Sequence, residues 1–138
     1  MKKQKVSDEK PGLARRSVCP ITNTLDVLGD KWTLLVVRDM FLGKKTYGEF
    51  LASPEGIPTN ILADRLKRLE QHGIIDRTPY QQSPVRYAYR LTSKGQQLSP
   101  VINAIIEWGL DNIPGTKVAG DAGQEQIRNQ KGPDSIKS

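Results

Sequence analysis

Apolar residues at helical spacing fill the first half of the chain after a polar opening stretch. They predict three helices, over residues 20–28, 31–43 and 47–53. The second is apolar around most of its circumference, so we expect it to be a buried central helix, with Asp30 placed as its cap. Thr46 and Glu49 have the spacing of a capping box, which favours a helix start at the third.

A fourth helix is predicted over residues 58–71, where leucines line one face. Leu62, Leu66 and Leu69 fall within about 60° of one another at 100° per residue, and Gly73 is the expected stop. The opposite face is polar and carries Asn60, Asp64, Lys67 and Arg68, with Thr59 near the N-terminal tip. This helix is therefore expected to bury its leucines and expose a polar, largely cationic face.

Beyond residue 73 the pattern changes from helical to strand-like. Residues 74–80 and 85–92 are predicted as the two strands of a hairpin. In the second strand two sets of residues alternate, Val85, Tyr87, Tyr89 and Leu91 on one face against Arg86, Ala88 and Arg90 on the other. The polar segment between the strands places Gln82, Ser83 and Arg86 at an exposed tip.

The last predicted helix, residues 93–112, is too apolar for a helix that packs on one domain alone. Its apolar residues cover about 240° of the circumference, where a surface helix usually shows a stripe of about 100°. The surplus indicates a partner chain, most simply an identical one related by two-fold symmetry. Pro100 lies inside the segment, so the helix either kinks there or restarts with Ser99 as a cap.

One folded domain is expected between two polar ends. Residues 1–18 are predicted to form a flexible basic arm and residues 115–138 a disordered tail, which leaves a domain of residues 19–114. The apolar runs are all far shorter than eighteen residues, and the N-terminal lysines are not followed by an apolar segment, which argues against a membrane span or a secretory signal. The single cysteine fits a reducing cytoplasm.

Positive charge is concentrated in two parts of the chain. Residues 1–18 hold six Lys or Arg against two Asp or Glu, and residues 60–95 hold seven against three, within a formal net charge of +6. Clustering of this kind favours a polyanionic partner. The alternative is a surface that only keeps the protein soluble.

The order of elements is that of a winged helix-turn-helix, mainly α with a small β-hairpin wing. If the helix over residues 58–71 docks in the major groove of double-stranded DNA, the hairpin tip can reach a neighbouring phosphate ridge. Asn60 suits a bidentate pair with adenine, and Thr59 suits a thymine methyl group or a phosphate. Lys67 and Arg68 suit phosphate or guanine. Asp64 would be unfavourable beside phosphate unless it accepts from a cytosine amino group.

Several of these residues also have a purely structural interpretation. Thr59 alternatively only caps its helix, and Arg65 lies near the buried face, where an internal salt bridge competes with a DNA contact. Tyr87 and Tyr89 are expected in the core, Arg90 beside an acidic partner, and His72 at a helix end without a chemical role.

The sequence as a whole resembles the HxlR-type winged-helix transcriptional regulators. The segments that carry the resemblance are CPITNTLDVLGDKWTLLVVRDM, YGEF, GIPTNILADRLKRLEQHGII and VRYAYRLTSKGQQLSPVINAIIEWG, in this order between residues 18 and 114. The resemblance implies a bacterial-type cytoplasmic regulator, most often a repressor, that binds a pseudo-palindromic operator. It also implies a homodimer that forms through the N-terminal and C-terminal helices.

Cys19 is the second candidate for chemistry. It precedes a proline at a helix start, where amide N–H groups and the helix dipole favour a thiolate, and Arg15 and Arg16 are close in sequence. Some regulators of the family that this chain resembles sense oxidants or electrophiles through a cysteine at this position. The alternative is a small residue buried in the dimer interface.

Other classes of function find little support in the sequence. One cysteine and one histidine leave too few ligands for a zinc site, and we expect no metal and no cofactor. The sequence has no Ser/His/Asp set, phosphate-binding loop or paired carboxylate motif, so an enzyme is not expected. The remaining alternatives are a winged helix that binds another protein, and a regulator that responds to a small ligand without thiol sensing.

Overall fold

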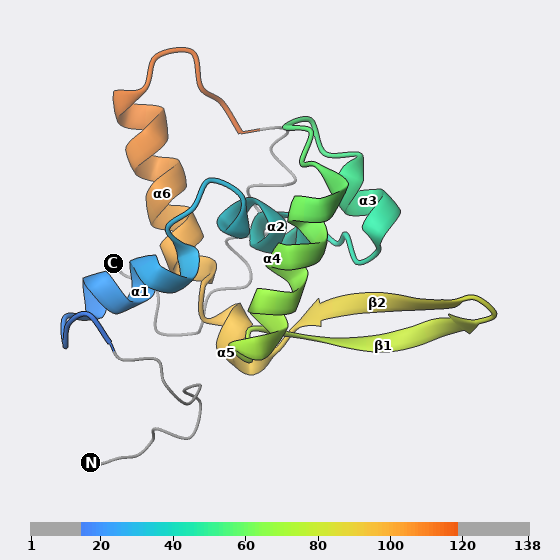
Figure 1. The fold of residues 1–138 in the computed structure, drawn as a ribbon. Coiled ribbons are helices and arrows are strands. Elements are labelled where there is room, and N and C mark those ends of the chain that lie inside the picture. Colours follow the sequence, from blue (N-terminus) through green and yellow to red (C-terminus); the bar gives the residue numbers. More distant parts are fainter. Residues whose placement is uncertain (1–14, 119–138) are drawn as a thin grey trace.

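The computed structural model describes residues 15–118 (Figure 1). Within them the elements are α1 (Pro20–Leu28), α2 (Thr33–Phe41), α3 (Tyr47–Leu51), α4 (Thr59–Gln71), β1 (Ile75–Gln82), β2 (Val85–Leu91), α5 (Ser93–Gln96) and α6 (Ser99–Asn112). The predicted winged helix-turn-helix, mainly α with one hairpin, is confirmed. Most of the predicted basic arm and disordered tail lies outside the described residues.

The core forms where the leucines of α4 pack against α2 and α3. Leu62, Leu66 and Leu69 are each at most 2% exposed. They belong to one cluster with Val37 of α2 and Phe50 of α3. This cluster fixes which side of α4 faces solvent, because its polar residues must occupy the remaining arc.

Helix starts follow the predicted capping residues with two differences. The α3 capping box is present, with Thr46 and Glu49 in their expected roles. Trp32, not the predicted Asp30, lies at the N-cap of α2, which begins two residues later than predicted. Asp30 instead accepts from the backbone N–H groups of Trp32 and Thr33. Thr59 is the first residue of α4 and makes no capping hydrogen bond; its capping interpretation is therefore wrong.

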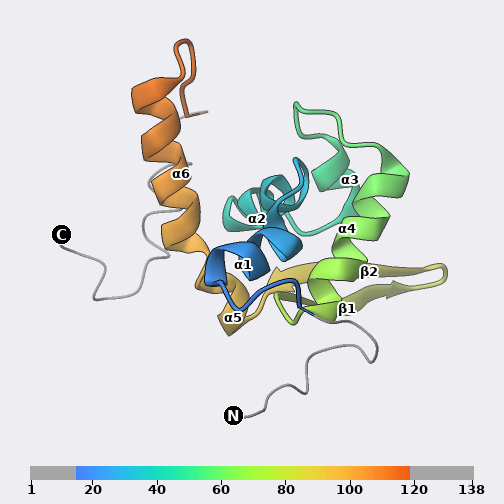
Figure 2. The ribbon, with the colours of Figure 1, turned by 60° about the vertical axis from the view of Figure 1, so that its left-hand side comes forward.

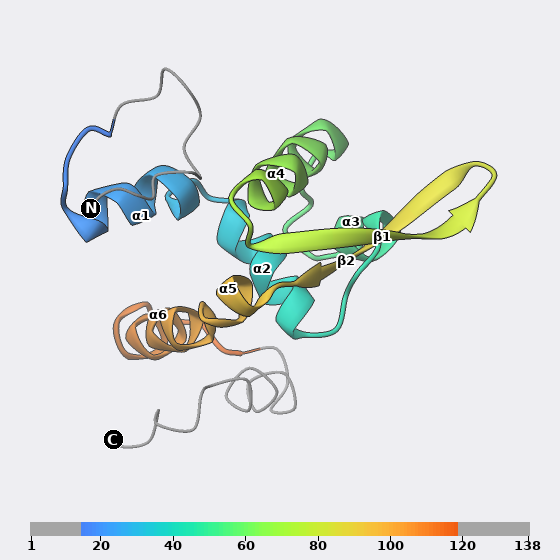
Figure 3. The ribbon, with the colours of Figure 1, turned by 90° about the horizontal axis from the view of Figure 1, so that it is seen from below.

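The hairpin is longer on its first strand than predicted. β1 runs to Gln82 and pairs antiparallel with β2, so the connection is only Ser83 and Pro84. An irregularity in the register between Pro79 and Gln81 lets the strand continue past a residue that has no N–H to donate. Figure 3 shows that the hairpin projects past α3, which leaves its outer half in solvent.

Alternation in β2 holds in the half of the strand that lies on the core. Tyr89 is buried and Tyr87 is half-buried, whereas Arg86 and Arg90 are exposed. Val85 was predicted on the same face as the tyrosines, but it is exposed because it lies at the projecting end.

The predicted last helix is divided in two. α5 ends at Gln96, and Pro100 lies in the first turn of α6, so the chain restarts rather than kinks. The residue at the N-cap of α6 is Leu98 rather than Ser99. In Figures 1 and 2, α6 stands on the side of the molecule away from the hairpin.

Candidate nucleic-acid interface

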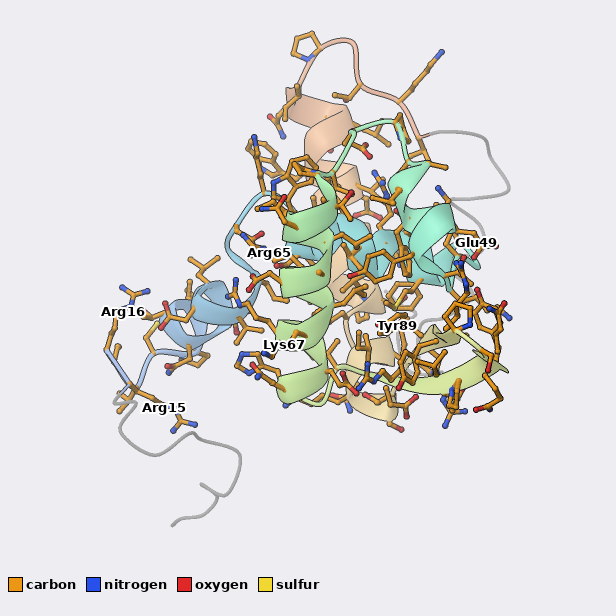
Figure 4. All side chains as sticks on the ribbon, turned by 45° about the vertical axis from the view of Figure 1, so that its right-hand side comes forward. Arg15, Arg16, Glu49, Arg65, Lys67 and Tyr89 are labelled. Carbon is orange, nitrogen blue, oxygen red and sulfur yellow. The ribbon has the colours of Figure 1, made fainter. Side chains whose placement is uncertain are left out.

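The outward face of α4 carries the residues predicted to read DNA. Thr59, Asn60, Asp64 and Lys67 are exposed, while Arg68 is half-buried. Figure 4 shows Lys67 and Arg65 along this helix, with Tyr89 on its other side toward the core. The face therefore offers an amide, a hydroxyl and an ammonium group, which are donors suited to base edges and phosphates.

Arg65 is held inside the protein by two carboxylates. Its Nε lies 2.8 Å from Oδ2 of Asp30, and its Nη1 pairs with the carboxylate of Asp64. The side chain is only 17% exposed. The expected internal salt bridge is thus present, and it joins the middle of α4 to the turn before α2.

Asp30 is the centre of this arrangement. Besides Arg65, its carboxylate accepts the N–H groups of Trp32 and Thr33 and the Thr33 hydroxyl. Partial burial alone would raise the pKa of Asp30, but the hydrogen bonds from Thr33, Arg65 and Trp32 together keep it well below its ordinary value of 3.8. The carboxylate therefore joins the backbone at the start of α2 to the side chain of Arg65 on α4.

Two further contacts place α4 beside α1. Arg68 approaches the backbone oxygen of Asp26 at 3.5 Å, a long hydrogen bond. The Asp26 carboxylate in turn binds Arg16, whose Nη2 lies 2.5 Å from Oδ1. Arg16 therefore pairs with Asp26, although the sequence suggested that it would act on Cys19.

The tip of the wing is open to solvent. Gln82, Ser83 and Arg86 are all exposed, as the hairpin prediction required. Arg90 forms the expected ion pair with an acidic neighbour, 2.8 Å from Oδ1 of Asp76. Across the turn Gln82 pairs with Val85, and Arg86 pairs with Gln81.

Arg77 was not identified from the sequence, yet it links the wing to α4. Its guanidinium lies 4.1 Å from the centroid of the Tyr87 ring, and its Nε lies 3.4 Å from Oε2 of Glu70 in the last turn of α4. In the register of the hairpin Arg77 pairs with Tyr89, the next residue but one from Tyr87. The sequence offered the alternation of the strands but no signal for that register.

Cys19 lies just before α1 and is half-buried. Hydrogen bonds from the backbone of Thr22 and Ile21, and from the Thr22 side chain, lower the pKa of its thiol below the ordinary value of 9.0. The predicted influence of a helix N-terminus is thus present. It acts through amide groups of the first turn, which a cysteine at this position meets directly.

The fold and the exposed α4 define a winged helix-turn-helix protein. The model of the HxlR-like helix-turn-helix family matches residues 27–117. This chain therefore belongs to the HxlR-like helix-turn-helix family.

Relatives and solved structures agree with this assignment. An HTH-type transcriptional regulator of Synechocystis is 40% identical over 94 residues, which are 68% of this chain and 70% of that protein. The redox regulator HypR in its reduced form is 36% identical with a TM-score of 0.64, over 70% of this chain and 95% of HypR. The reduced form of the transcriptional regulator YodB from Bacillus subtilis is 29% identical with a TM-score of 0.59, over 73% of this chain and all of YodB. These relatives are regulators of transcription rather than enzymes.

Between residues 15 and 118 no helix is long and apolar enough to cross a membrane. The same residues contain no group of three or more His, Cys, Asp or Glu side chains placed to hold a metal ion.

The substitution Asp30→Asn is predicted to destabilise the fold by about 1–3 kcal/mol at pH 7, because it removes a charged acceptor of two backbone N–H groups and the partner of Arg65. Since the pKa of Asp30 is lowered by folding, its contribution is present above about pH 4 and is lost as the pH falls. Urea unfolding between pH 7 and pH 2 measures this. The difference between the two proteins should shrink in acid.

Asp26→Asn is the matched control, because it removes an exposed carboxylate that also pairs with an arginine. Its effect at pH 7 should be clearly smaller. Equal effects of the two substitutions, or a difference that grows in acid, would contradict the anchoring role of Asp30.

Proposed function

We propose that this protein is a sequence-specific repressor of transcription that binds double-stranded DNA in the cytoplasm at a pseudo-palindromic operator. The observation that carries the proposal is the polar outward face of α4, held in place by the leucine core beneath it and by Asp30. Family membership supports it, since the relatives are HTH-type transcriptional regulators.

Within this proposal the exposed residues have separate tasks. Asn60 and Thr59 at the start of α4 read base edges, and Lys67 and Arg68 contact phosphate or guanine. The Asp64 carboxylate repels a nearby phosphate and accepts a hydrogen bond from a cytosine amino group. Arg65 supports α4 from below and reaches DNA only if its ion pairs open. Gln82, Ser83 and Arg86 of the wing contact the phosphate backbone.

Asn60→Ala is predicted to relax base choice at one operator position by about 1–3 kcal/mol, because a bidentate contact is lost.

Arg86→Ala should weaken binding to all duplexes alike. It should also reduce the slope of the logarithm of the binding constant against the logarithm of the salt concentration by about 0.9, the value for one phosphate contact. Fluorescence anisotropy with operator and base-substituted duplexes measures both effects.

Unchanged sequence preference in Asn60→Ala would show that α4 does not read bases through this face. A shallow salt dependence of the unaltered protein, with no preference for duplex, would instead favour a winged helix that binds another protein.

We further propose that two copies associate through α1 and α6. These helices and the residues just before them expose large apolar side chains, namely Val18, Ile21, Leu25, Val101, Ile105 and Trp108. Trp108 is 63% exposed and borders a shallow groove on α6 with Pro100 and Ala104. A two-fold pairing in which α1 of one copy covers this groove on the other buries both apolar faces and presents two α4 helices to one duplex.

Trp108→Glu is predicted to raise the dissociation constant of the dimer at least tenfold, because a charge would be buried in the apolar contact. Sedimentation velocity at micromolar concentration measures the change. Tyr80→Glu is the matched control, since Tyr80 is a similarly exposed aromatic residue on the wing. Sedimentation of the unaltered protein as a monomer, with and without DNA, would overturn the pairing.

A second proposal is that oxidation of Cys19 controls DNA binding. It is supported by the lowered pKa of the thiol and by the likeness to the redox regulator HypR. With one cysteine per chain, the products open to it are a sulfenic acid, a mixed disulfide or a bridge between two chains. Each of these would alter the N-terminal end of α1, which belongs to the proposed dimer contact.

Cys19→Ser is predicted to bind the operator as tightly as the unaltered protein under reducing conditions but to lose any response to diamide. Gel shifts with and without diamide measure this. An equal response in the two proteins would remove Cys19 as the sensor and leave it as an interface residue.

A further inference from the structure

A cavity of about 510 Å³ lies between α2 and α6, apart from the face of α4. Leu34 and Leu35 of α2 form one wall, and Ile102 and Ile106 of α6 form the opposite wall. The segments 53–55 and 116–118 also line it. Its volume lies within the range of about 300–1,000 Å³ that small-molecule sites occupy, and its walls are largely apolar, as such sites are.

One end of the cavity contains a built polar network. Arg38 binds Glu55 through two hydrogen bonds of 2.9 Å and also binds Asp39 at 2.9 Å. Asp39 is 4% exposed and accepts a further hydrogen bond of 2.5 Å from the hydroxyl of Ser53. Both carboxylates of the cavity are therefore engaged by the same guanidinium.

Lys44 reaches this network from the loop after α2. Its Nζ donates to Oγ of Ser53 at 2.7 Å, and within residues 15–118 it forms no ion pair with a carboxylate shorter than 4 Å. Lys117 lines the cavity as well. The lining thus holds three cationic side chains against the two carboxylates, and the excess charge is positive.

We propose that this cavity binds a small organic acid, whose apolar body lies between α2 and α6 and whose carboxylate or phenolate group meets Lys44. The excess positive charge favours an anion over a cation. The apolar walls favour an aromatic or branched aliphatic body over a sugar or a nucleotide.

The site adjoins the proposed dimer contact and shares Ile105 with it. Val101, Ala104 and Trp108 form the groove on the outer side of α6, whereas Ile102 and Ile106 face α2. A ligand in the cavity would contact α2, on which α4 packs, and α6, which forms part of the proposed dimer contact. Control of operator binding by this ligand rests on the proposed function, but ligand binding itself does not.

Gly109 provides a variant that adds a side chain where the cavity is lined by none. It lines the cavity, and a Cβ added to it meets no atom within 4 Å. Gly109→Leu therefore adds a side chain to open space inside a helix that tolerates it better than glycine. Gly48→Leu is the matched control, because Gly48 of α3 is equally unobstructed but does not line the cavity.

The test is calorimetric titration of the full chain, without DNA, with 1-naphthoate and with its uncharged analogue 1-naphthamide. We expect saturable binding of 1-naphthoate at one site per chain, abolished by Gly109→Leu and retained by Gly48→Leu. Lys44→Gln should weaken binding of 1-naphthoate about tenfold and leave 1-naphthamide unchanged, because only the acid uses the ammonium group. Thermal unfolding confirms that each variant is folded.

Absence of saturable binding at millimolar probe, or equal binding to Gly109→Leu and Gly48→Leu, would overturn the site. Equal loss of both probes in Lys44→Gln would overturn the choice of an acid. Because the titration contains no DNA, these outcomes are separate from failure of the proposed operator binding.

Discussion

Burial of the leucine face of α4 is the constraint from which the rest of the structure follows. Leu62, Leu66 and Leu69 are enclosed by α2, α3 and the hairpin, so the rotation of α4 about its own axis is fixed. Asn60 and Lys67 then have to face solvent on the opposite arc. A helix that reads DNA needs this fixed rotation, because its side chains must meet base edges in one register.

A second constraint is electrostatic and acts through one carboxylate. Asp30 accepts from the backbone N–H of Trp32 and binds Arg65, so the start of α2 and the middle of α4 are held by the same group. At the C-terminal end of α4, Arg77 joins the helix to the wing, because it contacts both Glu70 and the Tyr87 ring. α4 and the wing are therefore positioned as one unit before any DNA arrives.

Periodicity and capping signals predicted the helices, the hairpin and the exposed face, because each depends on residues close in sequence. An internal ion pair of Arg65 was expected, but Asp30 as its partner was not, since the pair joins residues 35 positions apart. The length of β1, the pairing of Arg16 with Asp26 and the cavity beside α6 likewise depend on tertiary packing.

The central claim is that two α4 helices, one from each copy, enter successive major grooves on one side of a duplex. Hydroxyl-radical footprinting on the tightest duplex selected from a random pool tests it most directly. The account predicts two protected patches with two-fold symmetry, about one helical turn or 10 base pairs apart. A single unsymmetrical patch, or uniform weak protection along the duplex, would contradict it.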